Sequence, residues 1–199
     1  MRHFICAAFL LAMVAYPSVS NADENKGEKK ENAKPTPQTV DVGKQAPEFK
    51  IKASDGKVID LAQLTKKGPV LVRLTCGCSG CDKELAYFQT LHKAYKGKGL
   101  ISLAIFRESD DKVETYVKSK KLKMLYAVDP KGRSWEIFQT KTMPTNFLIE
   151  KGGRIKAIAF GCEPSGLVAE ALSKKVADLL KTEAADVRKK TQKKDVQKK

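Results

Sequence analysis

Residues 70–85 read VLVRLTCGCSGCDKEL and decide the fold that we expect for this chain. Residues 69–74 are apolar apart from Arg73 and have the length of a buried β-strand. From Cys81 onward, apolar residues recur at helical spacing until Gly97 ends the pattern. A strand that passes directly into a helix, with three cysteines at the junction, indicates an α/β domain that carries thiol chemistry there.

Strand and helix signals alternate on both sides of this stretch. A hairpin with turn residues Ser54-Asp55-Gly56 is predicted from the apolar positions around it. Further strands are predicted at 100–106, 125–128, 147–149 and 155–160, and helices at 110–121, 134–138 and 167–180. This order predicts an α/β fold of three layers, with a central mixed sheet, an N-terminal hairpin and helices on both faces.

Composition divides the chain into four segments. Residues 1–22 combine a basic start, a short apolar stretch and small residues up to Ala22, which is the pattern of a secretory signal peptide; an uncleaved anchor is the alternative. Residues 23–40 are polar and are predicted to be a disordered linker. The domain is expected at 41–182 and a basic disordered tail at 183–199. We therefore expect a periplasmic or otherwise extracytoplasmic protein with no membrane span after signal removal.

The net charge of +15 raises the question of a nucleic-acid partner. Lysine dominates this charge, aromatic residues are few, and the sequence contains no stacking platform or basic recognition helix, so we expect no nucleic-acid binding. A solvated basic surface is the first interpretation, and attraction to acidic partners or anionic lipid is the second. No glycine-rich phosphate loop is found, and no organic cofactor is expected.

Cys78 and Cys81 form a C-x-x-C pair at the predicted start of the helix. Unpaired backbone N–H groups and the helix dipole favour an anion there, and a thiolate is such an anion. Exposed Cys78 would attack a partner disulfide, and shielded Cys81 would resolve the mixed disulfide. Zinc sites use the same spacing, so the pair alone does not exclude a metal.

Two segments carry a resemblance to a known family. Residues 70–85, quoted above, resemble the active-site segment of thioredoxin-like proteins, and residues 142–155 (TMPTNFLIEKGGRI) resemble their cis-proline loop and following hairpin. The resemblance covers roughly residues 41–182 and points to exported thiol-disulfide oxidoreductases of the TlpA/ResA type, which have a redoxin (AhpC/TSA-like) domain. It implies protein thiols or disulfides as substrates, and a further redox protein as electron donor or acceptor.

The resemblance also assigns roles to single residues. Cys78 matches the attacking cysteine, Cys81 the resolving one, and Glu84 a buried glutamate that could take the proton of Cys81. Glu84 could instead be a first-turn residue that favours the helix dipole. Pro144 matches the cis-proline, which would leave the backbone of Met143 open to an extended substrate; a proline at the start of a strand is the alternative.

Three positions depart from the family pattern. Gly77 stands where an aromatic residue usually precedes the first cysteine, and no proline lies between Cys78 and Cys81. Both changes should make the site more open and less rigid. Arg73 occupies a strand position that is normally aromatic in the family. A buried arginine needs a partner, which the sequence does not identify.

Cys76 and Cys162 are additional thiols. In an extended chain the Cα atoms of Cys76 and Cys78 would lie about 6–7 Å apart, near the upper limit for a disulfide. Cys76 could be a buried bystander, an exchange partner of Cys78, or a ligand of a soft metal such as Cu(I) or zinc. The resemblance puts Cys162 at the same end of the sheet, where it could complete two disulfides or a tetrahedral site, or remain a separate surface thiol. The alternative functions are a metal-binding or metal-delivery module that uses Cys76, Cys78, Cys81 and Cys162, and a thiol peroxidase.

Overall fold

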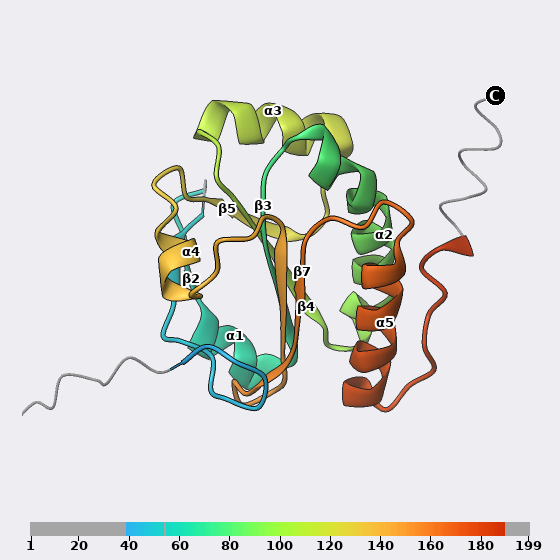
Figure 1. Cartoon of the computed structure of the whole chain (residues 1–199). Helices are drawn as coiled ribbons and strands as arrows, with labels where there is room; N and C mark the ends of the chain where they lie inside the picture. Colours follow the sequence, from blue (N-terminus) through green and yellow to red (C-terminus); the bar gives the residue numbers. More distant parts are fainter. Residues whose placement is uncertain (1–38, 54, 190–199) are drawn as a thin grey trace, which may run out of the picture. The chain divides into compact units, whose positions relative to one another are not determined.

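The computed structural model describes residues 39–53 and 55–189 (Figure 1). The signal peptide predicted at 1–22 and most of the linker predicted at 23–40 lie outside these residues. Within the described ranges, no helix has the length and apolar character to cross a membrane. The strands are β1 (Lys50–Lys52), β2 (Val58–Asp60), β3 (Val70–Thr75), β4 (Ile101–Phe106), β5 (Leu125–Val128), β6 (Thr145–Ile149) and β7 (Ile155–Phe160). The helices are α1 (Leu61–Lys67), α2 (Ser79–Tyr95), α3 (Asp110–Lys120), α4 (Arg133–Ile137) and α5 (Leu167–Leu180), with a 3-10 turn at Lys96–Lys98.

A mixed sheet with the strand order β5-β4-β3-β6-β7 forms the centre of the domain. β3, β4 and β5 pair in parallel, whereas β6 pairs antiparallel with β3 and with β7. β1 and β2 form a separate antiparallel hairpin. This arrangement confirms the predicted fold class, and every element predicted from the sequence begins and ends within two residues of its expected bounds. β3 is the central strand of the sheet. The segment that follows it therefore lies at the C-terminal end of the parallel strands, midway across the sheet.

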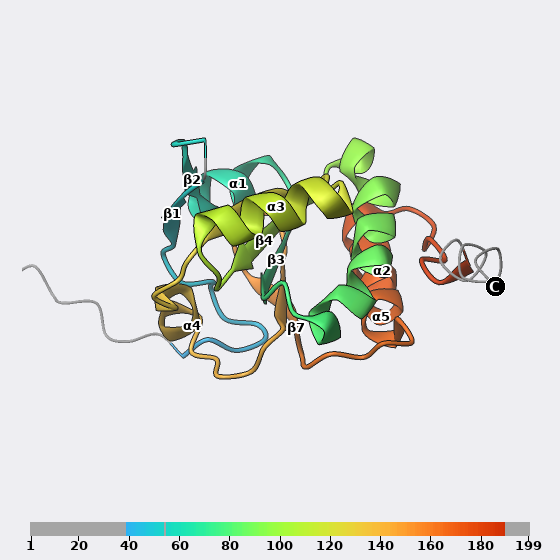
Figure 2. The same ribbon diagram turned by 90° about the horizontal axis from the view of Figure 1, so that it is seen from above.

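Alternate side chains of β3 enter two different cores. Leu71 packs with Phe88 of α2 and Leu172 of α5, whereas Val72 packs on the opposite face with Leu61 of α1 and with Phe138, which follows α4. Figures 1 and 2 show this layering, with α2 and α5 side by side on one face of the sheet and α1 and α4 on the other. The two-residue period of a strand thus produces helices on both faces.

Helix α1 was not predicted from the sequence. Its N-cap is Asp60, whose carboxylate accepts hydrogen bonds from the backbone N–H groups of Ala62 and Gln63. The helix has seven residues and buries only Leu61 and Thr65, so it presents too few apolar positions for a helical period to emerge.

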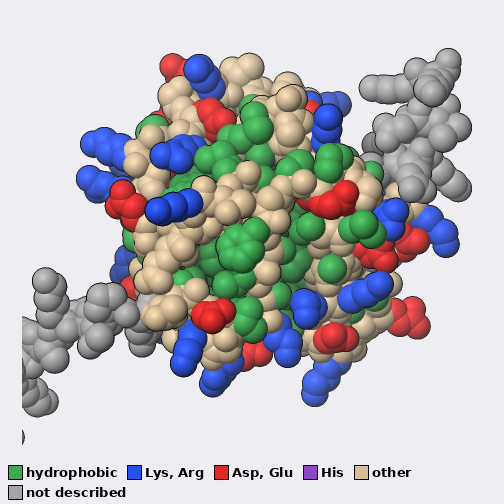
Figure 3. Space-filling view, in the orientation of Figure 1, with side chains coloured by type: hydrophobic (Ala, Val, Ile, Leu, Met, Phe, Trp, Pro, Cys, Tyr) green, Lys and Arg blue, Asp and Glu red, His purple; other side chains and the backbone are tan. Residues whose placement is uncertain are grey.

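On the face shown in Figure 3, lysine and arginine side chains are spread around the periphery among acidic ones. The basic residues do not gather there into a single patch, and apolar side chains occupy much of the middle of this face. On this face, such a distribution is typical of a solvated charged surface.

The packed domain extends beyond residue 182, where we expected a disordered tail to begin. Val187 is fully buried, and the backbone N–H of Ala185 donates a hydrogen bond to the Tyr95 hydroxyl at 2.7 Å. Arg188 also forms an ion pair with Glu170 of α5, with 2.9 Å between Nη1 and Oε2. The sequence prediction therefore placed the end of the ordered domain too early, because charged residues around Val187 masked its role.

Val187→Ala should lower the free energy of unfolding by about 1–2 kcal/mol, because roughly 0.8 kcal/mol is lost for each buried methyl-sized group. Val42→Ala is the matched control, since Val42 is 54% exposed, and its effect should stay within about 0.5 kcal/mol. Urea unfolding of both variants measures the difference. Equal stabilities would contradict the packing of the segment at 183–189.

Candidate active site

A link of three residues carries the chain from β3 into α2. β3 ends at Thr75 and α2 begins at Ser79, so residues 76–78 form the whole connection. Cys78 is the N-cap residue of α2 and has an extended backbone, with φ −71° and ψ 160°. Its side chain is exposed at the positive end of the helix dipole, whereas Cys81, one turn further, is buried. The two thiols therefore differ in access as the sequence predicted.

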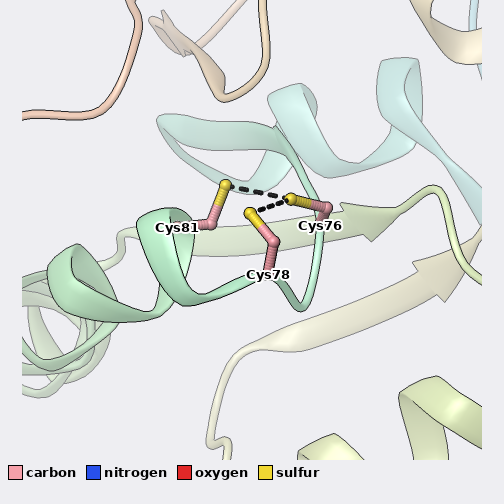
Figure 4. Close-up of side chains that lie close together, drawn as sticks. All are labelled: Cys76, Cys78 and Cys81. Carbon is pink, nitrogen blue, oxygen red and sulfur yellow. Dashed lines mark hydrogen bonds between the residues drawn. The ribbon is translucent and has the colours of Figure 1, made fainter.

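Three sulfur atoms meet at this link. The Sγ of Cys76 lies 2.6 Å from the Sγ of Cys78 and 3.3 Å from the Sγ of Cys81, as Figure 4 shows. All three sulfurs lie within 4.8 Å of one another. The half-buried Cys76 thus contacts both members of the C-x-x-C pair.

The contacts give the three thiols different acidities. The pKa of Cys78 is lowered, first by the hydrogen bond from the Cys76 thiol and then by the backbone N–H groups of Cys81 and Gly80. The pKa of Cys76 is raised, mainly by burial and also because its thiol is the donor to Cys78. Of these two thiols, Cys78 therefore ionises more readily, and Cys76 retains its proton more strongly.

Arg73, whose partner the sequence did not identify, is buried under α2 together with three partners. Its guanidinium donates to Oε2 of Glu84 and to Oδ1 of Asn146, each at 2.9 Å. Asn146 stands directly opposite Arg73 on the neighbouring strand β6. The guanidinium also lies over the Phe88 ring, with 4.1 Å from Cζ to the ring centroid. A buried charge of this kind is tolerated because it is paired and hydrogen-bonded.

Glu84 joins three parts of the fold. One carboxylate oxygen accepts from Arg73 on β3, and the other accepts the backbone N–H of Glu163, which follows β7, at 3.0 Å. The side chain is completely buried, and these contacts tie α2 to β3 and to the segment after β7. Each carboxylate oxygen has a second lone pair, so the role of Glu84 as acceptor of the Cys81 proton stays a prediction.

The predicted cis-proline loop leads into β6, the strand that pairs with β3. The peptide bond between Met143 and Pro144 is cis, and Pro144 is buried while Met143 is half-buried. The carbonyl oxygen of Pro144 accepts the backbone N–H of Gly161 at 2.8 Å. The Thr145 hydroxyl donates to the carbonyl of Thr142 at 2.7 Å. These bonds hold the loop in one shape next to the segment that carries Cys162.

Cys162 reaches the same edge of the sheet but stands outside the sulfur cluster. Its thiol is exposed and donates a hydrogen bond to the carbonyl oxygen of Gly80 at 2.8 Å. Gly80 lies between Cys78 and Cys81 in the sequence. Burial and the nearby Glu84 carboxylate raise its pKa. Among the described residues, the group whose geometry suits a metal ion contains three cysteines and does not include Cys162.

Two further residues border the link and were missed by the sequence analysis. Glu108 accepts the backbone N–H of Gly77 at 2.8 Å, and the ring of Tyr116 lies against Gly77, so that a β-carbon there would be 3.4 Å from Cδ2. Tyr116 in turn donates to Asp82 in the first turn of α2 at 2.9 Å. Glu108 could have been found, because it follows β4 and the carboxyl ends of adjacent parallel strands share one edge.

Residues 42–158 match the AhpC/TSA family model. The thiol-disulfide oxidoreductase ResA of Bacillus thuringiensis subsp. konkukian is 34% identical over 117 residues, which are 58% of this chain and 68% of that protein. ResA of Bacillus subtilis is 26% identical over 132 residues, covering 66% of this chain and 74% of that protein.

Solved structures show the same relationship. A putative thiol:disulfide interchange protein DsbE from Chlorobium tepidum superposes with a TM-score of 0.65 and 25% identity, covering 71% of this chain and 99% of that one. A putative thioredoxin from Neisseria meningitidis superposes with a TM-score of 0.57 and 27% identity, covering 66% of this chain and 89% of that one.

Cys76→Ala should raise the pKa of Cys78, because it removes the thiol hydrogen bond that is the largest cause of the lowered value. Cys76→Ser is the matched control, since a hydroxyl can still donate to the Cys78 thiolate. The measurement is the pH dependence of Cys78 alkylation by iodoacetamide, read by mass spectrometry. Only the thiolate reacts, so the wild-type midpoint should fall below about 8.5, the value of an ordinary thiol. The alanine midpoint should lie above both wild type and serine, and equal midpoints in the two variants would contradict the assignment.

Proposed function

Because the chain belongs to the AhpC/TSA family and to its ResA-like thiol-disulfide oxidoreductases, we propose that it exchanges thiols and disulfides with protein partners outside the cytoplasm. The single observation that carries this proposal is the exposed Cys78 thiol, which has a lowered pKa and a second thiol in contact with it. An accessible thiolate with a thiol beside it has both parts that exchange requires.

In the proposed reaction the Cys78 thiolate attacks one sulfur of a partner disulfide. A mixed disulfide forms between Cys78 and the partner, and the other partner sulfur leaves as a thiol. An inner thiol, Cys81 in the simplest scheme, then attacks Cys78, so that the partner leaves with two thiols and the chain keeps one disulfide. The reverse sequence oxidises a partner dithiol. Glu84 and Arg73 position the helix on which Cys81 lies.

Partner recognition is proposed for the surface beside the cis-proline loop. Met143 is half-buried and lies two residues before β6, and an extended partner segment could pair with its backbone as an added strand. Phe160 and Leu167, which flank the Cys162 segment, are 60% and 52% exposed and offer apolar contact to the same partner. Export is supported by the signal-peptide pattern at 1–22.

Cys78→Ser should reduce the rate of insulin disulfide reduction in the presence of dithiothreitol by about 100-fold or more, because a serine hydroxyl does not ionise at neutral pH. Cys162→Ser is the control and should keep activity close to wild type. The precipitation of the insulin B chain measures the rate. Activity of Cys78→Ser equal to wild type would rule out Cys78 as the attacking group.

The sulfur cluster also supports a second candidate, a thiol-based metal module on the same fold. Three sulfur ligands at about 2.3 Å from one ion stand about 4 Å from each other, which is compatible with sulfurs that lie within 4.8 Å. Thiolates are the ligands that Cu(I) prefers. In this scheme Cys76, Cys78 and Cys81 hold the ion.

Anaerobic titration of the reduced chain with Cu(I) tests this candidate. Binding of one equivalent that survives in Cys162→Ser and is lost in Cys76→Ser is the expected result for a trithiolate site. Retention of the ion by Cys76→Ser would exclude that ligand set, as would a wild-type chain that takes up no copper.

A further inference from the structure

Cys76 adds a third sulfur to the C-x-x-C pair and contacts both of its members. Its Sγ is 2.6 Å from the attacking sulfur of Cys78 and 3.3 Å from the buried sulfur of Cys81. Each sulfur of the pair therefore has Cys76 within contact distance, as the two dashed lines in Figure 4 show. A thiol in contact with an attacking sulfur is placed to resolve the bond which that sulfur makes.

We propose that Cys76 is a third redox-active cysteine, which resolves the mixed disulfide at Cys78 and then passes the disulfide inward to Cys81. This inference rests on the proposed function, since it needs a mixed disulfide on Cys78. Cys81 remains a partner in the final disulfide, but it acts after Cys76.

The first step releases the partner. The Cys76 sulfur attacks the Cys78 sulfur, the bond from Cys78 to the partner breaks, and a disulfide between Cys76 and Cys78 forms. The proton of the Cys76 thiol goes to the departing partner sulfur, so the partner leaves as a thiol. The partner has then gained two electrons, and the chain has lost two.

The second step moves the disulfide. The Cys81 sulfur attacks Cys76, the bond between Cys76 and Cys78 breaks, and a disulfide between Cys76 and Cys81 forms. The Cys81 proton goes to the Cys78 sulfur, so that no electrons leave the chain in this exchange. Cys78 is again a free thiol while the chain remains oxidised.

Two features favour the first step over direct attack by Cys81. Cys76 already touches Cys78, with 2.6 Å between the two sulfurs, and it also lies 3.3 Å from the sulfur of Cys81 that must follow it. Part of the raised pKa of Cys76 comes from the hydrogen bond that it donates to Cys78. That part disappears once the Cys78 sulfur is bonded to a partner and no longer carries a negative charge.

Two features also favour the second step. Exchange expels the sulfur with the lower pKa more readily. The hydrogen bond from Cys76, the largest cause of the lowered pKa of Cys78, is absent from the disulfide, but the backbone N–H groups of Cys81 and Gly80 still lower that pKa. A disulfide between Cys76 and Cys78 would close a ring across a single residue, near the geometric limit for such a bond. The buried Cys81 gives the disulfide a position away from solvent thiols.

This order has a functional consequence. A two-cysteine site loses its nucleophile when it is oxidised, because the attacking sulfur is tied into the disulfide. In the proposed order the oxidised chain keeps Cys78 as a free thiol, at a position that is exposed in the structure. Cys78 could then attack the disulfide of a second partner and rearrange it, although the chain has already given two electrons to the first partner and still holds the disulfide between Cys76 and Cys81.

The first test compares mixed-disulfide lifetimes in a Cys162→Ser background. Reduced Cys76→Ser and Cys81→Ser chains are mixed with oxidised glutathione, quenched in acid and weighed by mass spectrometry. The glutathione adduct on Cys78 should last about tenfold longer in Cys76→Ser than in Cys81→Ser, because the contacting thiol resolves it faster. A longer lifetime in Cys81→Ser would overturn the proposal.

The second test locates the free thiol of the oxidised chain, in the Cys162→Ser background. Free thiols are blocked with iodoacetamide, the disulfide is reduced, and the released thiols receive a second label before tandem mass spectrometry. Cys78 should carry the first label; the first label on Cys76 or on Cys81 would overturn the relay. If the double variant Cys76→Ser/Cys81→Ser forms no glutathione adduct on Cys78, the proposed function itself fails, which separates the two failures.

Discussion

The shortness of the link between β3 and α2 is the constraint on which the site depends. Only residues 76–78 connect a central strand, fixed by pairing on both sides, to a helix whose first turn contains Cys81. The chain must turn within this link, and the side chains at both of its ends face the helix start. Cys76 and Cys78, at the two ends of the link, are thereby placed near the backbone N–H groups at the start of α2 and near the buried sulfur of Cys81. The acidity difference between Cys76 and Cys78 follows from this geometry.

The buried ion pair of Arg73 and Glu84 links the beginning of α2 to the central strand β3. Removing two charges from water is costly, and an apolar pair of similar volume would often be as stable. The pair does, however, connect β3 to α2 through Arg73 and connects α2 to the segment after β7 through the N–H of Glu163. Asn146 extends the connection to β6, which begins just after the cis-proline. Breaking one partner would leave an unpaired buried charge and cost about 3–5 kcal/mol.

The sequence predicted the strands and long helices because apolar periodicity reports which face is buried, and it identified Cys78 and Cys81 from their spacing at a strand–helix junction. It did not reveal α1, whose seven residues bury too little for a period, or the partners of Arg73, which come from residues distant in the chain. The sequence offered three interpretations of Cys76 and could not choose among them, whereas the structure shows its contact with both other sulfurs. Distances between side chains across a turn depend on backbone angles, and a spacing of residue types does not specify those angles.

Gly77 lacks the aromatic side chain that related proteins usually have at this position, but an aromatic ring from another part of the chain lies beside it. The resemblance to thioredoxin-like proteins led us to expect a more open site, because glycine replaces the usual aromatic residue. The ring of Tyr116 fills the space next to Gly77 and is fixed there by edge contact with Phe106, at 5.6 Å between centroids. An alignment column would score the aromatic side chain as absent, although another helix supplies it. Covariation between the two positions, with one bulky ring shared between them, is therefore the evolutionary signature to seek among relatives of this chain.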